Sequence, residues 1–164
     1  MRANLYPLPL LLLSACLWTA PAGAAVTVSF TSPESYTDIG RYRDEPNAEM
    51  KAIEAHLKKL GERYLPPDQS LKIEVLDVDL AGDLRPSRRS GEDVRIVRGK
   101  ADWPKIKLHY VLEADGRVLA DQQEKIADMD YLQHPSRRYS NQSLTYEKQI
   151  LDDWFRQRFA AHKP

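Results

Sequence analysis

The dipeptide Asp115-Gly116 constrains the fold of this chain more than any other feature of its sequence. It lies between two stretches, 104–114 and 117–126, that we expect to be the two strands of a hairpin. Asp-Gly is favoured in the two-residue type I′ turn, because both central residues of that turn need a positive φ. The sequence therefore predicts a tight antiparallel hairpin.

A two-residue turn also predicts which residues of the hairpin face each other. Leu112 is expected opposite Leu119, and Lys107 opposite Glu124. The first pair is apolar and the second has opposite charges, and both kinds of pair stabilise antiparallel strands.

Three further stretches have the composition of strands: 26–30, 71–80 and 94–98. The segment 83–93, DLRPSRRSGED, contains proline, glycine and charges of both signs. We therefore expect it to be a loop.

Two helices are predicted from apolar residues that recur at helical spacing. The first follows Asp44 and Pro46, a suitable cap and first-turn residue, and extends to Tyr64. The second covers 144–159, with these apolar residues on one arc: Leu144, Ile150, Leu151, Trp154, Phe155 and Phe159. On the opposite side of this helix we expect Asp152, Asp153 and Arg156 to face solvent.

Together these segments predict one α+β domain, a mostly antiparallel sheet of about five strands with two helices packed on it. The chain that follows residue 24 has about 140 residues, the length of one ordinary domain. No internal repeat suggests a different architecture.

The first 24 residues have the layout of a secretory signal: a basic residue, Arg2, a leucine-rich run, and small residues at Ala22 and Ala24. We expect cleavage after Ala24, which leaves residues 25–164 as a periplasmic protein without a transmembrane span. Prolines interrupt the apolar run, so a retained membrane helix is not expected.

Cys16 offers a second interpretation of the same segment. Residues 13–16, LSAC, resemble the lipoprotein box of bacteria, in which the cysteine receives a lipid anchor. Leu17 and Trp18 would be an unusually apolar start to the tether that follows such an anchor. Ordinary cleavage is our expectation, and a membrane-anchored lipoprotein is the alternative.

The charge balance argues against one class of function, and the cysteine content indicates how the fold is stabilised. Without Arg2, the chain after residue 24 carries 23 basic and 24 acidic residues, a balance that does not suit nucleic-acid binding. Cys16 is the only cysteine, so ordinary cleavage leaves no disulfide and the core alone must hold the fold.

Three blocks follow the first strand in a characteristic order: LPPDQSLKIEVLDVDLAGDL, WPKIKLHYVL and LTYEKQILDDWFRQRF. With the export signal and the VTVSF strand before them, they resemble a family of exported bacterial proteins that is catalogued only as a domain of unknown function. The resemblance covers nearly all of the chain after residue 24. It implies no activity, catalytic residue, cofactor or ligand.

One stretch resembles a calcium-binding loop. Residues 77–83, DVDLAGD, place carboxylates at positions one, three and seven of such a loop and glycine at position six. Position five, however, is Ala81 and position twelve is Arg88, and neither can supply the expected oxygen. We therefore interpret Asp77 and Asp79 as solvated carboxylates near the end of a strand, and we predict no metal and no cofactor.

Other polar residues also lack a catalytic pattern. None of the histidines has the spacing of metal ligands: His56, His109, His134 and His162. No nucleophile motif or phosphate-binding loop is present, so we predict no catalytic residue. The basic residues of the 83–93 loop are the candidates for contact with a partner or an anion: Arg85, Arg88 and Arg89.

Glu147 is the residue that the pattern does not explain, because it falls inside the apolar arc of the second helix. Our expectation is a first-turn carboxylate that interacts with the helix dipole beside a capping Ser143. The alternative is a buried carboxylate bonded to Tyr110, Lys148 or an arginine of the sheet, which would mark a functional pocket.

Two functions follow from these observations. The first is an exported cell-envelope protein that binds a protein partner or an anionic envelope component without catalysis. The alternative is a small periplasmic hydrolase or metal-dependent enzyme, whose site would bring together Asp77, Asp79, His109 and Glu147, with Tyr146 nearby. The two hypotheses differ in whether these side chains meet in one cleft.

Overall fold

The computed structural model describes residues 24–39, 47–87, 93–99, 101–133 and 144–160. Its elements, in chain order, are β1 (Ala25–Phe30), the short 3-10 helix η1 (Pro33–Ser35), α1 (Asn47–Tyr64), β2 (Gln69–Asp79), β3 (Asp83–Pro86), β4 (Asp93–Ile96), β5 (Lys105–Ala114), β6 (Arg117–Ala127) and α2 (Thr145–Phe159).

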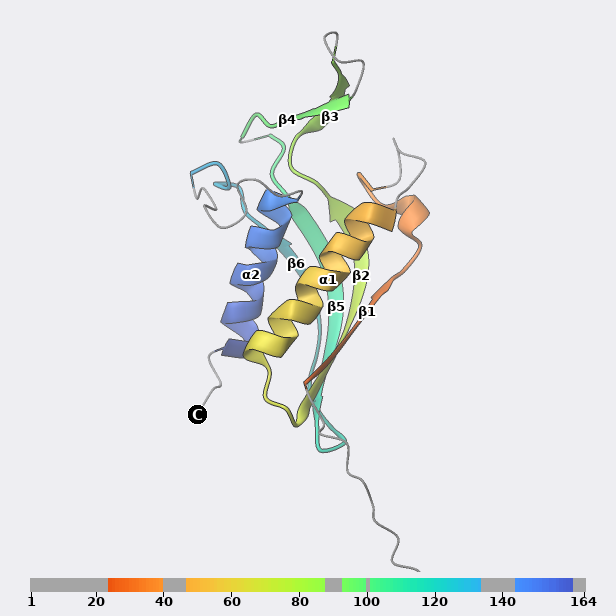
Figure 1. Cartoon of the computed structure of the whole chain (residues 1–164), viewed down its shortest axis with the longest axis vertical. Helices are drawn as coiled ribbons and strands as arrows, with labels where there is room; N and C mark the ends of the chain where they lie inside the picture. The colour runs from red at the N-terminus through yellow and green to blue at the C-terminus, as the bar shows by residue number, and fades with distance from the viewer. Residues whose placement is uncertain (1–23, 40–46, 88–92, 100, 134–143, 161–164) are drawn as a thin grey trace, which may run out of the picture.

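The main sheet has four strands in the order β1-β2-β5-β6 (Figure 1). β1 is parallel to β2, and the other two neighbouring pairs are antiparallel. The α+β prediction and the mostly antiparallel sheet are therefore confirmed.

The predicted strand count of the sheet is corrected. β4 does not join the sheet but pairs antiparallel with β3, and together they form a ribbon that projects from one end of the molecule (Figure 1). The segment 83–93 was expected to be a loop, but its first residues, Asp83–Pro86, form β3. Proline suits this position because the ribbon is all edge.

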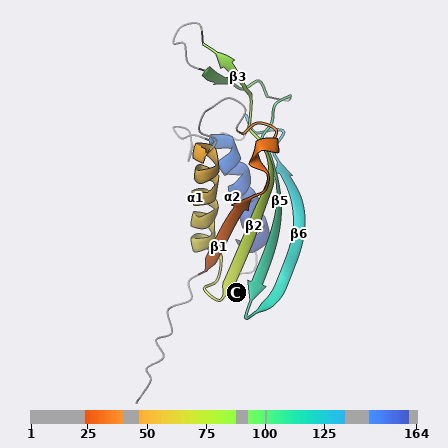
Figure 2. The same ribbon diagram turned by 90° about the vertical axis from the view of Figure 1, so that its right-hand side faces the viewer.

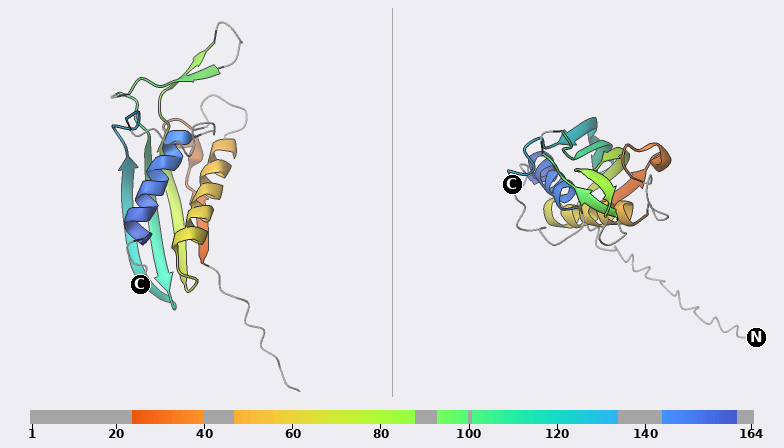
Figure 3. Two further views of the ribbon diagram at one scale, coloured as in Figure 1. Left: turned by 60° about the vertical axis from the view of Figure 1, so that its left-hand side comes forward. Right: turned by 90° about the horizontal axis from the view of Figure 1, so that it is seen from above.

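Both helices pack on the same face of the sheet, and the other face is left without a helix (Figure 2). α1 lies over β1 and β2, and α2 lies over β5 and β6 (Figure 3). The core between the layers includes Tyr36, Ile53, Leu57, Leu71, Ile73, Ile106, Leu108, Leu151 and Phe155. Gly61 lets α1 approach β1 closely, because a Cβ there would lie 2.0 Å from Cγ2 of Val26.

The β5–β6 hairpin has the predicted turn. Asp115 has φ 50° and Gly116 has φ 72°, as a type I′ turn requires. Ala114 and Arg117 form the first pair of the ladder beyond the turn.

The predicted register of this hairpin is wrong beyond its first pairs. Leu112 faces Ala120 instead of Leu119, and Lys107 faces Lys125 instead of Glu124, because a β-bulge inserts one extra residue in β6. The bulge carries Ile126 to the helix-covered face, where it is buried. A strand without the bulge would turn that side chain to the opposite face.

The predicted exposure of Asp152 is also wrong. This residue is 3% exposed, and its Oδ1 lies 2.9 Å from Nε2 of His56 on α1. The predicted apolar arc of α2 accounts for contact with the sheet alone. α1 packs against the flank of α2 as well, so a second side of the helix is covered.

Candidate functional site

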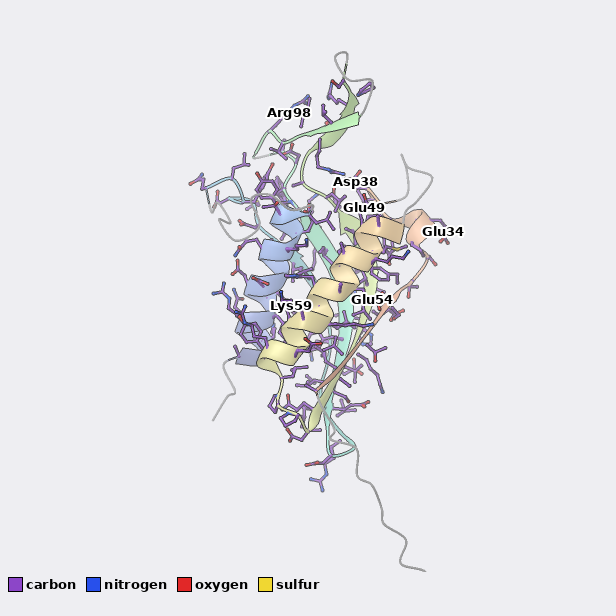
Figure 4. The ribbon with its side chains drawn as sticks, in the orientation of Figure 1. Glu34, Asp38, Glu49, Glu54, Lys59 and Arg98 are labelled. Atoms are coloured by element: carbon purple, nitrogen blue, oxygen red, sulfur yellow. The ribbon has the colours of Figure 1, made fainter. Side chains whose placement is uncertain are left out.

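The end of the sheet from which the ribbon projects contains a cluster of polar contacts. Nη1 of Arg95, in β4, donates to Oδ2 of Asp38 at 3.0 Å, and to the carbonyl oxygens of Ala81 at 3.1 Å and Gly82 at 3.2 Å. Asp38 follows η1, and Figure 4 shows it near the first turn of α1. The arginine therefore ties the root of the ribbon to the segment that leads from β1 to α1.

Glu147 joins this cluster from α2. Its side chain is buried, with 3% of the residue exposed, and its Oε1 accepts a hydrogen bond of 2.8 Å from the backbone N–H of Ala81. Burial raises the pKa of Glu147, whereas the Ala81 N–H and the nearby charge of Arg95 act in the opposite direction.

Glu147 lies in the first turn of α2, as expected, but it is buried and bonded to another element, so interaction with the helix dipole does not describe its whole role. The alternative of a buried carboxylate describes it better, although its partner is a backbone N–H and not Tyr110 or Lys148. The N-cap of α2 is Leu144, in the left-handed conformation and without a side-chain cap. Ser143, the predicted cap, lies outside the described residues.

A second set of hydrogen bonds lies at the root of the ribbon. The hydroxyl of Tyr131 donates to Oδ1 of Asp102 at 2.8 Å and accepts from the N–H of Gly99 at 3.2 Å. The N–H of Gly82 also donates to the carbonyl of Asp102, at 3.0 Å. Burial raises the pKa of Tyr131 to about 12, so the hydroxyl stays protonated as a donor. Tyr146 packs edge-on against its ring, with centroids 4.7 Å apart.

The helix-free face of the sheet carries three of the candidate residues, each with a different neighbour. Asp77 accepts from the backbone N–H of Thr37 at 2.8 Å. Asp79 forms an ion pair with Lys105. Both acids therefore make structural contacts from β2 to neighbouring segments, Asp77 to the segment that follows η1 and Asp79 to β5.

His109 lies on the same face between two acids. Its Nε2 is 2.7 Å from Oδ1 of Asp121, and its Nδ1 is 3.6 Å from Oε2 of Glu74. The hydrogen bond with Asp121 raises the pKa of His109, and Glu74 adds to this effect.

The residues of the enzyme hypothesis therefore do not meet. Asp77, Asp79 and His109 project to the helix-free face, whereas Glu147 is buried on the helix side at the end of the sheet. Among the described residues, no three or more His, Cys, Asp or Glu side chains are grouped so that they could hold a metal ion.

The outer face of the ribbon is an exposed surface that combines apolar and charged groups. Val94 and Ile96 are 44% and 38% exposed, and they lie opposite Arg85 and Asp83 respectively. Directly opposed residues of an antiparallel pair point to the same side, so these four side chains share one face. Arg85 is exposed and lies 3.6 Å from Asp83. Two other predicted contact residues, Arg88 and Arg89, lie outside the described residues, as does Cys16.

The model of one protein family, described as a protein of unknown function (DUF3016), matches residues 24–157. The chain belongs to this family. The predicted resemblance to an uncharacterised family is thereby confirmed, and the DUF3016 description assigns no activity. No curated protein and no solved structure matches the chain. Within the described part of the DUF3016 chain, no helix combines the length and apolar character that crossing a membrane requires.

Sequence reasoning missed the residues that build the ribbon root. Arg95 and Asp38 are far apart in the sequence. The other acceptors of Arg95 include backbone carbonyls, and because every residue has one, residue type does not identify them. The one available signal was Glu147, a carboxylate inside an apolar arc.

Proposed function

We propose that this protein is an exported, non-catalytic binding protein of the bacterial cell envelope, and that it contacts a partner protein through the outer face of the β3–β4 ribbon. The observation that carries the proposal is the exposure of Val94 and Ile96 on an element that projects from the body. Removing such β-branched apolar side chains from water on contact with a partner is favourable.

The root of the ribbon supports this role. Arg95 bonds to Asp38 and to the carbonyls of Ala81 and Gly82, so the ribbon is fixed where it leaves the sheet. An element that is held in place before binding loses less conformational entropy when a partner is bound.

The charges beside the apolar pair indicate the partner's character. Arg85, in β3, is exposed. Arg98, just after β4, is also exposed (Figure 4). Arginine is enriched at protein interfaces, where its guanidinium pairs with carboxylates. We therefore propose an acidic protein surface, with Arg85 and the sequence neighbours Arg88 and Arg89 as contact residues.

Export to the periplasm is part of the proposal. It is supported by the signal-like layout from Arg2 to Ala24 and by the beginning of β1 at Ala25, immediately after the expected cleavage site. The lipid-anchored alternative through Cys16 would place the same domain at a membrane surface.

Site-specific photocrosslinking in intact cells tests the proposal. A photoreactive residue in place of Val94 is expected to crosslink a specific protein, and Arg85→Glu in the same chain should remove that product. Glu62, exposed on α1, is the matched control position and should give no specific product. Products of a lipid or polysaccharide at position 94 would identify the anionic component instead, and equal products at both positions would contradict the proposed surface.

A further inference from the structure

We infer that two copies of this chain associate edge to edge through β6, with the two β6 strands antiparallel, so that their main sheets form one continuous sheet. This inference concerns a different surface from the ribbon and does not depend on the proposed function.

The outer edge of β6 is open in the described part of the chain. β6 is the last strand in the order β1-β2-β5-β6, and β5 is its one strand neighbour there (Figure 3). Gln122 projects to the helix-covered side of β6, yet it is exposed. The helices therefore leave this edge accessible, and an exposed edge of backbone N–H and C=O groups is a template for another strand.

The symmetry of such a pair limits the possible registers. A two-fold axis perpendicular to the sheet keeps the helix-covered faces of both copies on the same side. Residues that point to the same face must then be opposed, so the axis passes through one residue of β6 and its copy.

With the axis at Gln123, the pairs are complementary. Asp121 lies opposite Lys125 of the second copy, and by symmetry this ion pair occurs twice. On the other face, Gln122 lies opposite Glu124, an amide beside a carboxylate. Ala120 lies opposite Ile126, and this apolar pair ends the matched segment just beyond the bulge.

The neighbouring registers oppose less favourable pairs of residues. An axis at Asp121, Glu124 or Lys125 places each of these charged residues against its own copy, and like charges that are directly opposed destabilise a sheet. An axis at Gln122 brings no opposite charges together. The β6 sequence therefore favours the Gln123 register among those centred on residues 121–125.

The other edge of the sheet offers no comparable pattern. β1, with the sequence AVTVSF, contains no charged residue, so charge cannot select a register along it. Charge complementarity therefore favours association of two copies through β6 and not through β1.

Charge reversal tests the inference. Sedimentation equilibrium of the purified protein is expected to show a reversible dimer that weakens as salt is added, because the ion pairs are solvent-exposed. Asp121→Lys and Lys125→Asp should each weaken dimerisation at least about tenfold, since each creates two like-charge pairs. An equimolar mixture of these two variants should form a heterodimer, because both of its pairs are again opposite in charge. The double variant should dimerise like the wild type.

Two controls separate this result from loss of folding. Lys51→Glu changes an exposed charge on α1 and should leave the dimer unchanged. His109→Ala removes the histidine contact of Asp121 without changing the edge charges, and it should also dimerise. A wild-type protein that stays monomeric would overturn the inference, as would a dimer that tolerates both reversals or a variant mixture that fails to associate.

Discussion

Glu147 and Ala81 are joined by a buried hydrogen bond that links the start of α2 to the end of β2. Because the acceptor is a side-chain oxygen, glutamine can keep the bond and alanine cannot. We expect Glu147→Gln to change the free energy of unfolding by less than about 1 kcal/mol at pH 7, whereas Glu147→Ala should lose about 1–3 kcal/mol by leaving the Ala81 N–H without its acceptor. Urea unfolding of the two variants measures the difference. Equal losses would show that the charge, and not the acceptor, is what matters.

The pKa of Glu147 is raised in the fold, so its protonated form is the one that folding favours. This stabilisation is complete below the usual glutamate pKa of 4.5 and is lost as the pH rises through the raised pKa of the folded state. Relative to the wild type, Glu147→Gln should therefore gain stability between about pH 4.5 and pH 8. Melting temperatures of both proteins across this range test the sign, and a relative loss toward pH 8 would contradict the buried-carboxylate assignment.

His109 gives the same direction of pH dependence on the opposite face of the sheet. Its pKa is raised above 6.5 by the hydrogen bond with Asp121 and by Glu74. The contribution is complete below pH 6.5 and disappears as the pH rises through the folded pKa. His109→Gln should thus be less stable than the wild type near pH 5.5 and equal to it near pH 9. A pH-independent difference would show that the imidazole acts by packing alone.

The attachment of the β3–β4 ribbon to the sheet depends on Arg95. Arg95→Ala removes hydrogen bonds to Asp38 and to two carbonyls, and bonds that involve a charged group each contribute about 1.5–3 kcal/mol. We expect faster amide hydrogen exchange in β3 and β4, with β2 and β5 unchanged. Arg98→Ala, just beyond the same strand, is the control and should leave exchange as in the wild type. Uniformly faster exchange in the Arg95 variant would mean that this contact supports the whole fold.

The elements themselves could be predicted from sequence wherever the cause is local. Alternation, the Asp115-Gly116 turn and the apolar arcs identified both helices and all four strands of the main sheet. The bulge at Leu119 could not be predicted from the turn, because its effect is to place Ile126, seven residues further on, in the core. The burial of Asp152 depends in the same way on α1 and its His56.

The candidate site was less predictable for the same reason. Glu147 was identified as anomalous from sequence, but Ala81, its partner, supplies a backbone N–H that no residue type reveals. The proline and the charges of β3 are typical of a loop, and it is the pairing with β4 that makes this segment a strand.

The main sheet is covered by helices on one face only (Figure 2), and this limits where the protein can contact other molecules. The other face carries ion pairs such as Lys72 with Glu113 and Asp79 with Lys105. A face of paired, solvated charges gains little from burial, because charged groups lose their hydration when covered. Contacts with other molecules are therefore expected at the ends and edges of the fold, where the ribbon and β6 lie.

Whether the segment that contains Cys16 is cleaved off or lipidated decides where the protein resides. β1 begins at Ala25 and is paired with β2 from that residue, which lies opposite Ser70. Cleavage after Ala24 would thus release a chain that starts directly at the sheet, whereas lipidation would retain residues 16–24 as a tether.

We expect a mature chain that begins at Ala25, because Ala22 and Ala24 supply the small side chains that signal peptidase requires. Intact mass of the protein isolated from the periplasmic fraction measures the start directly. Cells grown with a clickable palmitate should leave the chain unlabelled, and Cys16→Ser should give the same mass and the same fraction. Palmitate label on the wild type that is absent from Cys16→Ser would instead establish a lipoprotein anchored through that cysteine.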